Sequence, residues 1–208
     1  SIFDEPRYSP LPSELTTEIF HFLDDDIYKY VWIQKIQDFQ LADDIYNYSI
    51  NPDKCYEFEE KINQAMNRFF NVKSEIVWGA GEPDFVALYK PNFPDDNNKI
   101  IFTGDAKSTK NQLWSINPWR LKQHMRKYDS QFTILITPKY TPSAKKDIED
   151  EKIVILSSMA LSEMIRNFIK HEDKPNFKDF YEIIEDNLWD DISDKFYEKI
   201  GQLYWKTI

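Results

Sequence analysis

The sequence predicts an α/β fold in which a mixed central sheet is flanked by helices. Residues 79–110 contain two apolar strands joined by a polar turn, and two more short apolar runs follow at 132–137 and 152–157. Segments with apolar residues at helical spacing precede, separate and follow these strands. Short strands alternating with helices are typical of a sheet whose faces are covered by helices.

The composition is that of a folded domain. The 208 residues are 41% hydrophobic and include 15 Phe, 12 Tyr and 6 Trp, which is enough to bury a sizeable core. The single cysteine, Cys55, excludes an internal disulfide framework and favours a reducing cytoplasm. No apolar run approaches the ~20 residues that a membrane span needs, so we expect no membrane partner. The first residue is Ser1, with no signal-peptide pattern after it, which is typical of a piece of a longer protein.

The pattern divides the chain into three parts: a helical extension over 1–50, a core over 51–170, and a helical extension over 171–208 that packs on the core. Apolar spacing predicts one or two helices between 27 and 50 and an amphipathic helix over 54–71.

The elements that follow the hairpin have clear start signals. Asn117 before Pro118 predicts the N-cap and first position of a helix. A helical connection from strand 100–108 to strand 132–137 predicts that these two strands pair in parallel. Residues 138–150 read as a polar excursion, and 158–169 as a helix.

Acidic residues mark one end of the predicted hairpin. Asp84 opens the first strand, and Asp105 and Lys107 close the second. Side chains alternate along a strand, so Asp105 and Lys107 share a face. If the strands pair, two carboxylates and an ammonium converge at one edge of the sheet. That is the chemistry of a Mg²⁺ site that activates water beside a phosphodiester, although an Asp after a Pro can also be a plain turn residue.

Pro83-Asp84 followed by Asp105-Ala106-Lys107 resembles the bipartite signature of the PD-(D/E)xK nuclease superfamily. The order of elements over 56–169 resembles the cleavage domain of type IIS restriction endonucleases, the FokI and AlwI groups among them. The resemblance implies a restriction-endonuclease-like core and a metal-dependent endodeoxyribonuclease. It also implies that Asp84, Asp105 and the main-chain carbonyl of Ala106 hold Mg²⁺, which Mn²⁺ can replace, and that Lys107 orients or deprotonates the attacking water.

The same resemblance adds an acidic helical residue. Glu59 matches a position from which members of the superfamily reach the metal site. The alternative is that Glu59 only stabilises the first turns of its helix.

A basic stretch follows the proposed site. The formal net charge is −10, which argues against a free-standing, tight DNA binder. We therefore expect sequence recognition to come from another domain or subunit. Between Ala106 and Tyr128, however, there is no Asp or Glu. A basic segment beside the site predicts contact with the phosphates of double-stranded DNA, and the candidates are Lys110, Arg120, Lys122 and Arg126, with His124 nearby. A solvated basic helix face is the alternative.

Two residues close to the proposed site are predicted to have structural roles only. Trp78 is predicted to lie in the core, and base stacking is the alternative. Glu82 is predicted to be an exposed loop acid, and a further metal ligand is the alternative.

Three functions remain open at this point. The first is a restriction-type cleavage domain in the cytoplasm of a bacterium or archaeon, pairing transiently as a homodimer or heterodimer to cut both strands. The second is a catalytically silent assembly module on the same fold. The third is a transposon or repair nuclease.

Overall fold

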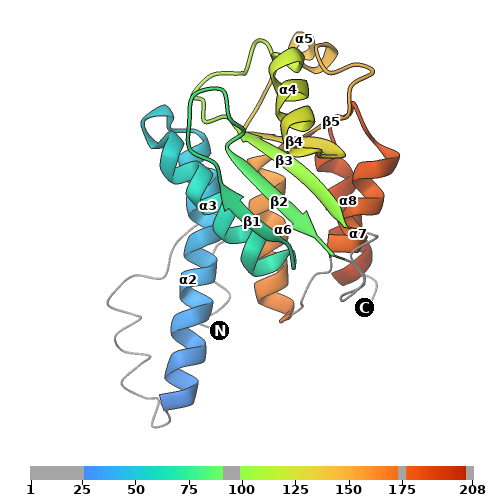
Figure 1. Ribbon diagram of the computed structural model, residues 1–208. Coiled ribbons are helices and arrows are strands. Elements are labelled where there is room, and N and C mark those ends of the chain that lie inside the picture. The colour runs from blue at the N-terminus through green and yellow to red at the C-terminus, as the bar shows by residue number, and fades with distance from the viewer. Residues whose placement is uncertain (1–25, 91–98, 173–176, 205–208) are drawn as a thin grey trace.

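The computed structural model describes residues 26–90, 99–172 and 177–204. Within them, one mixed sheet has its strands in chain order: β1 (Lys73–Ile76), β2 (Phe85–Tyr89), β3 (Ile100–Ala106), β4 (Phe132–Thr137) and β5 (Ile153–Ser157). The first three strands pair antiparallel, and β3, β4 and β5 pair in parallel. The predicted α/β class with a mixed sheet is confirmed (Figure 1).

Helices surround this sheet. They are α2 (Asp26–Ser49), α3 (Cys55–Phe69), α4 (Pro118–Tyr128), α5 (Pro142–Lys146), α6 (Ser158–His171), α7 (Phe177–Asp186) and α8 (Ser193–Tyr204), with a 3-10 turn, η1 (Pro52–Lys54), before α3. The Asn117 cap is confirmed, because its Oδ1 accepts a hydrogen bond from the Arg120 N–H at 3.1 Å. The short helix α5 lies where only a polar excursion was expected. Its own cap, Thr141, accepts from the Ala144 N–H.

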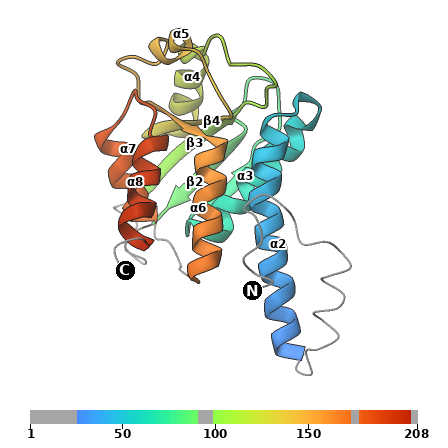
Figure 2. The same ribbon diagram turned by 180° about the vertical axis from the view of Figure 1, so that it is seen from behind.

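The two faces of the sheet carry separate hydrophobic clusters. Alternate residues of β4 and β5, such as Ile134 and Val154, join α3, α6, α7 and α8 in the larger cluster. The residues between them, such as Leu135 and Ile155, join α4 and α5 in the smaller one. Figure 2 shows α6 in front of the strands when the molecule is seen from behind, with α7 and α8 beside it. The face of β3 that carries Asp105 is therefore the one that α4 covers, because Phe102 and Ala106 lie in the larger cluster.

The predicted helical extensions share the larger core. Ala42 and Ile45 of α2, and Phe196 and Ile200 of α8, belong to the same cluster as the sheet. The first turns of α2 project away from the body in both views. Among the described residues, no helix is both long and apolar enough to span a bilayer.

The hairpin register depends on a glycine. β2 and β3 pair so that Phe85 is opposite Gly104, and the Asp84 N–H donates to the Gly104 carbonyl at 3.0 Å. A Cβ on Gly104 would lie only 1.9 Å from two carbons of the Phe85 ring. The Phe85 ring thus occupies the space that a side chain at position 104 would need, so this strand register requires a glycine there.

We expect Gly104→Ala to destabilise the protein by about 1–3 kcal/mol or more, because the methyl group would force the Phe85 ring and the adjoining strands apart. Urea unfolding measures this change. Gly201→Ala is the matched control: nothing lies within 4 Å of its added Cβ, and it lies within α8, so it should be neutral or stabilising. Equal stability of the two variants would show that the Phe85 ring yields freely.

Candidate active site

Asp84, Asp105 and Lys107 meet at the edge of the sheet that is formed by the strand ends, where β2 begins and β3 ends. Lys107 Nζ lies 2.8 Å from Asp105 Oδ2 and 3.5 Å from Asp84 Oδ2. The Ala106 N–H donates to Asp84 Oδ2 at 2.6 Å, and the Ala106 carbonyl accepts from Lys107 Nζ at 3.3 Å. Antiparallel pairing of β2 with β3 brings these groups together, as the alternation of the hairpin predicts. Asp105 is only 2% exposed, so the cluster is largely shielded from solvent on its β3 side.

Glu59 on α3 lies within the electrostatic field of this cluster. Burial, followed by the charge of Asp84, raises the pKa of Glu59 to about 7, and the charge of Lys107 opposes the rise. Burial also raises the pKa of Asp84, with Asp105 as the second cause. The site therefore concentrates negative charge that its own cations only partly offset.

We expect the stability of the cation-free protein to depend on Glu59. Because its folded pKa lies above its ordinary value, the native state binds a proton more tightly than the unfolded chain between about pH 4.5 and 7. Wild-type stability should thus fall over that window relative to Glu59→Gln. The gain for the variant at pH 8 should be about 1–2 kcal/mol, after a discount for partial solvent screening.

Urea unfolding of both proteins at several pH values in EDTA measures this difference. Glu60→Gln is the control, because Glu60 is the exposed neighbour on the same helix. A stability difference between wild type and Glu59→Gln that does not change from pH 5 to pH 8 would contradict the placement of Glu59 among these charges.

Arg120 was predicted to contact DNA, but the structure places its guanidinium on Asp105. Its Nη2 donates to Asp105 Oδ1 at 2.9 Å and to Oδ2 at 3.0 Å. Arg120 lies in the first turn of α4, whose backbone Asn117 caps, and α4 covers the face on which Asp105 lies. The buried carboxylate of Asp105 thus has two cationic partners, Lys107 and Arg120.

The other residues predicted to contact DNA differ in their exposure to solvent and in their ion pairs. Lys110 follows β3 and is exposed, and so is Arg126 on α4. Lys122 is half-buried and its Nζ lies 2.7 Å from Glu151 Oε1. His124 is 2% exposed and therefore belongs to the packed side of α4, not to a phosphate-facing surface. The basic stretch is thus a mixture of exposed, paired and buried residues.

Glu82 is engaged with α4. Its Oε2 accepts a hydrogen bond from the Tyr128 hydroxyl at 2.7 Å, and Lys127 pairs with its other oxygen. The predicted exposed loop acid is wrong, because these contacts tie the loop before β2 to the helix after β3. The same contacts engage both oxygens of Glu82, so its alternative reading as a metal ligand gains no support.

The oxygen donors at this edge suit a hard cation. In the part of the chain that the structure describes, no three His, Cys, Asp or Glu side chains form a group that could hold a metal. The oxygens that converge here are the carboxylates of Asp84 and Asp105 and the main-chain carbonyl of Ala106, all of the kind that Mg²⁺ prefers. The two hydrogen bonds that the Asp84 carboxylate accepts, from the Ala106 N–H and from Lys107 Nζ, both go to Oδ2 and not to Oδ1. This donor set fits Mg²⁺.

Exposed tryptophans occur on the segments that flank the site. Trp78 was predicted to lie in the core, and this is wrong: it is 65% exposed, on the loop between β1 and β2. Trp114, in the connection after β3, is 72% exposed, and Trp119, at the start of α4, is 66% exposed. In the same loop, Gly79 has φ 142° and Gly81 has φ 82°, a backbone that favours glycine.

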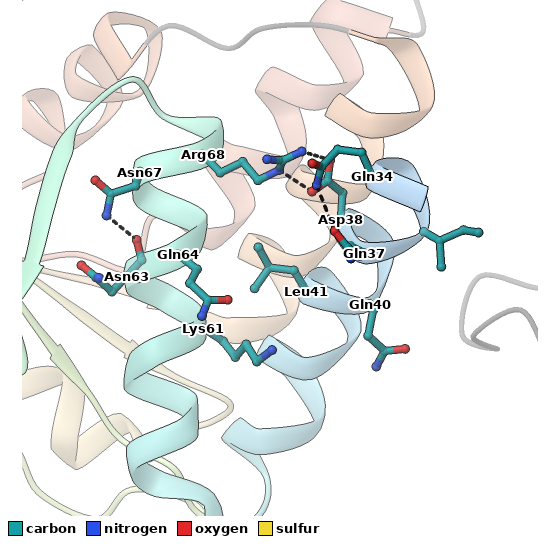
Figure 3. A pocket seen from close by; sticks show the side chains of 11 residues that line it. Gln34, Gln37, Asp38, Gln40, Leu41, Lys61, Asn63, Gln64, Asn67 and Arg68 are labelled. Carbon is teal, nitrogen blue, oxygen red and sulfur yellow. Dashed lines mark hydrogen bonds and ion pairs between the residues drawn. The ribbon is translucent and has the colours of Figure 1, made fainter. Parts of the chain in front are cut away.

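A pocket of about 660 Å³ lies elsewhere, between α2 and α3. Figure 3 shows its lining of carboxamides, including Gln34, Gln37 and Gln64, beside the ion pair of Asp38 with Arg68. None of the residues of the acidic cluster lines it. The pocket is therefore a groove between two helices, lined mainly by long polar side chains, and is separate from the candidate active site.

The fold is like that of solved structures of a restriction endonuclease. Two structures of the restriction endonuclease FokI, one of them bound to DNA, align with 86% of this chain at TM-scores of 0.57 and 0.55 and 10% sequence identity. The aligned part is 33% of the FokI chain. No family model matches the sequence.

The sequence itself is homologous to a segment of the type II restriction enzyme HgaI of Avibacterium volantium. The two are 39% identical over 152 residues, which are 72% of this chain and 30% of HgaI. The chain thus spans about a third of the length of the proteins that it matches.

Proposed function

We propose that this chain is the DNA-cleavage part of a type IIS-like restriction endonuclease and hydrolyses phosphodiester bonds. The observation that carries the proposal is the convergence of Asp84, Asp105 and Lys107, with 2.8 Å between the ammonium and Asp105, in a fold like that of FokI. Homology to HgaI supports it.

The residues take distinct roles in this reaction. Asp84, Asp105 and the Ala106 carbonyl would hold Mg²⁺. Bound there, the cation would polarise the scissile phosphate and lower the pKa of a bound water. Lys107 lies against both carboxylates, so its ammonium can hold the attacking water and offset the negative charge that develops on the phosphoryl oxygens. Glu59, with a pKa of about 7, is suited to accept a proton from a water at neutral pH.

The size and charge of the chain bear on its partners. Because the chain carries a net charge of −10, its own hold on double-stranded DNA should be weak. A further domain or a separate subunit would supply sequence recognition. A transient homodimer or heterodimer would bring two sites to the two strands, in the cytoplasm of a bacterium or archaeon.

Incubation of the chain at high concentration with supercoiled plasmid and Mn²⁺ or Mg²⁺ tests the function. We expect nicks and double-strand breaks that EDTA abolishes. Nicks alone would show that the sites act singly. Intact plasmid with either cation would contradict the proposed function and favour the assembly module, for which the exposed Tyr30, Val31 and Ile33 of the projecting part of α2 offer an apolar surface.

DNA engagement should depend on the exposed cations. We expect the double charge reversal of Lys110 and Arg126 to weaken binding of a short duplex and to make the dependence of log Kd on log salt shallower by about two phosphate contacts. Fluorescence anisotropy in Ca²⁺ at several salt concentrations measures both quantities.

The control reverses Lys146 on α5 and Lys170 on α6, two exposed lysines, which changes net charge by the same amount. If the dependence of log Kd on log salt is identical for all three proteins, Lys110 and Arg126 do not contact DNA and belong to a solvated basic face.

A further inference from the structure

We propose that Arg120 exchanges partners during the reaction, leaving Asp105 for a DNA phosphate when the divalent cation binds. This inference rests on the proposed function and concerns how the same site couples its cation to its substrate. The starting observation is the pair of hydrogen bonds from Nη2 to both oxygens of Asp105, at 2.9 and 3.0 Å.

The charge balance of the cluster favours this exchange. Asp84 and Asp105 are two acids in contact with two cations, Lys107 and Arg120. A bound divalent cation would therefore leave the cluster with an excess of positive charge, whether or not the nearby Glu59 is ionised. Because Asp105 would then be shared with that cation, its attraction for the guanidinium falls, while a phosphodiester brings the negative charge that the guanidinium lacks.

The side chains of Asp105 and Arg120 differ in how exposed they are. Asp105 is fixed, since it lies within β3 and its side chain is 4% exposed. The Arg120 side chain is 42% exposed, so it reaches the carboxylate from the solvent side of the cluster. Its backbone is held by the Asn117 cap in the first turn of α4. A long side chain on a fixed backbone can therefore swing toward solvent without any change in the fold.

The segment that carries Arg120 is basic. Between Ala106 and Tyr128 the chain has no acid. That segment therefore offers no acidic side chain with which a displaced Arg120 guanidinium could pair. Arginine suits planar, paired contacts with phosphate oxygens, and its Nε is buried with no hydrogen-bond partner among the described residues, so it has donor capacity left.

Calorimetric titration with Ca²⁺, without DNA, tests the exchange without any turnover. We expect Arg120→Met to bind Ca²⁺ about tenfold more tightly than wild type, because a positive charge that competes for Asp105 is gone. Arg120→Lys, which keeps the charge, should bind Ca²⁺ close to wild type. Lys146→Met, on exposed α5, controls for the loss of net charge.

The second readout is the affinity for a short duplex in saturating Ca²⁺, where Arg120→Met should bind about tenfold more weakly than wild type. The opposite signs of the two effects are the signature of exchange. If Arg120 only orients Asp105, both affinities should fall, and that result would overturn the inference. Unfolding in urea verifies that each variant is folded.

The outcomes also separate this inference from the proposed function. Wild-type protein that binds no Ca²⁺ would contradict metal dependence itself, and the exchange with it. Normal Ca²⁺ binding by wild type, with the affinity of Arg120→Met unchanged, would contradict the exchange alone.

Discussion

Lys107→Ala should lower plasmid cleavage by ~10²-fold or more while the protein remains folded, since this is the usual scale for a lost catalytic donor or base. Lys107 follows the last residue of β3, and its side chain is 31% exposed. It touches Asp105 at 2.8 Å and Asp84 at 3.5 Å. Its removal takes an ammonium away from the two acids, but Asp105 keeps Arg120 as a partner, so the core is not left with an isolated charge.

The experiment compares cleavage rates at equal protein concentration in Mn²⁺. Lys146→Ala is the control for loss of an exposed lysine. A stability within about 1 kcal/mol of wild type, measured by urea unfolding, would show that the loss is chemical. Cleavage by Lys107→Ala at the wild-type rate would remove the residue from the proposed mechanism.

The largest loss is expected for Asp84→Asn, at about 10³-fold or more in cleavage rate, together with loss of measurable Mn²⁺ binding. The reason lies in what the substitution preserves. Asp84 Oδ2 accepts the Ala106 N–H at 2.6 Å, and an amide oxygen can accept the same bond. The substitution removes the negative charge, one carboxylate oxygen and the ion pair with Lys107, but it keeps the hydrogen bond that holds the hairpin, so the hairpin should stay intact.

Asp147→Asn provides a matched control. Asp147 Oδ2 accepts the Ile116 N–H at 2.8 Å, which is the same kind of contact in a part of the chain away from the acidic cluster. It should leave Mn²⁺ affinity and cleavage unchanged. If Asp84→Asn retains Mn²⁺ affinity by calorimetry, the proposed donor set is wrong, whatever the cleavage rate shows.

The sequence predicted the hairpin and its acids because local rules determine them. Alternation along β3 separates Asp105 from Ala106, and the position of Asp84 before β2 places it opposite the end of β3. The N-cap at Asn117 and the parallel pairing of β3 with β4 also follow from nearby residues and from the handedness of such connections.

The contacts that were missed depend on how helices dock. Nothing in the spacing of α4 shows that Arg120 turns onto Asp105 while Lys122 pairs with Glu151. Both contacts follow from packing α4 on one particular face of the sheet. The same holds for Trp78, whose aromatic character predicts burial, although the loop that carries it runs outside the core. The metal-ligand and DNA-contact roles of these residues stay predictions, because they concern partners and not the fold.

The exposed indoles give the molecule an intrinsic optical reporter. Trp78 and Trp114 lie on the loops before β2 and after β3, and Trp119 directly precedes Arg120. Their emission arises beside the edge where a duplex would rest, whereas the aromatic rings that fill the large core are mostly phenylalanines. Contact quenching by a neutral solute such as acrylamide would sample these indoles together with other exposed ones such as Trp189, which is 53% exposed, and nucleic acid seated over the edge would shield Trp78, Trp114 and Trp119 from the quencher. Occupancy of the surface can thus be followed in the unlabelled protein.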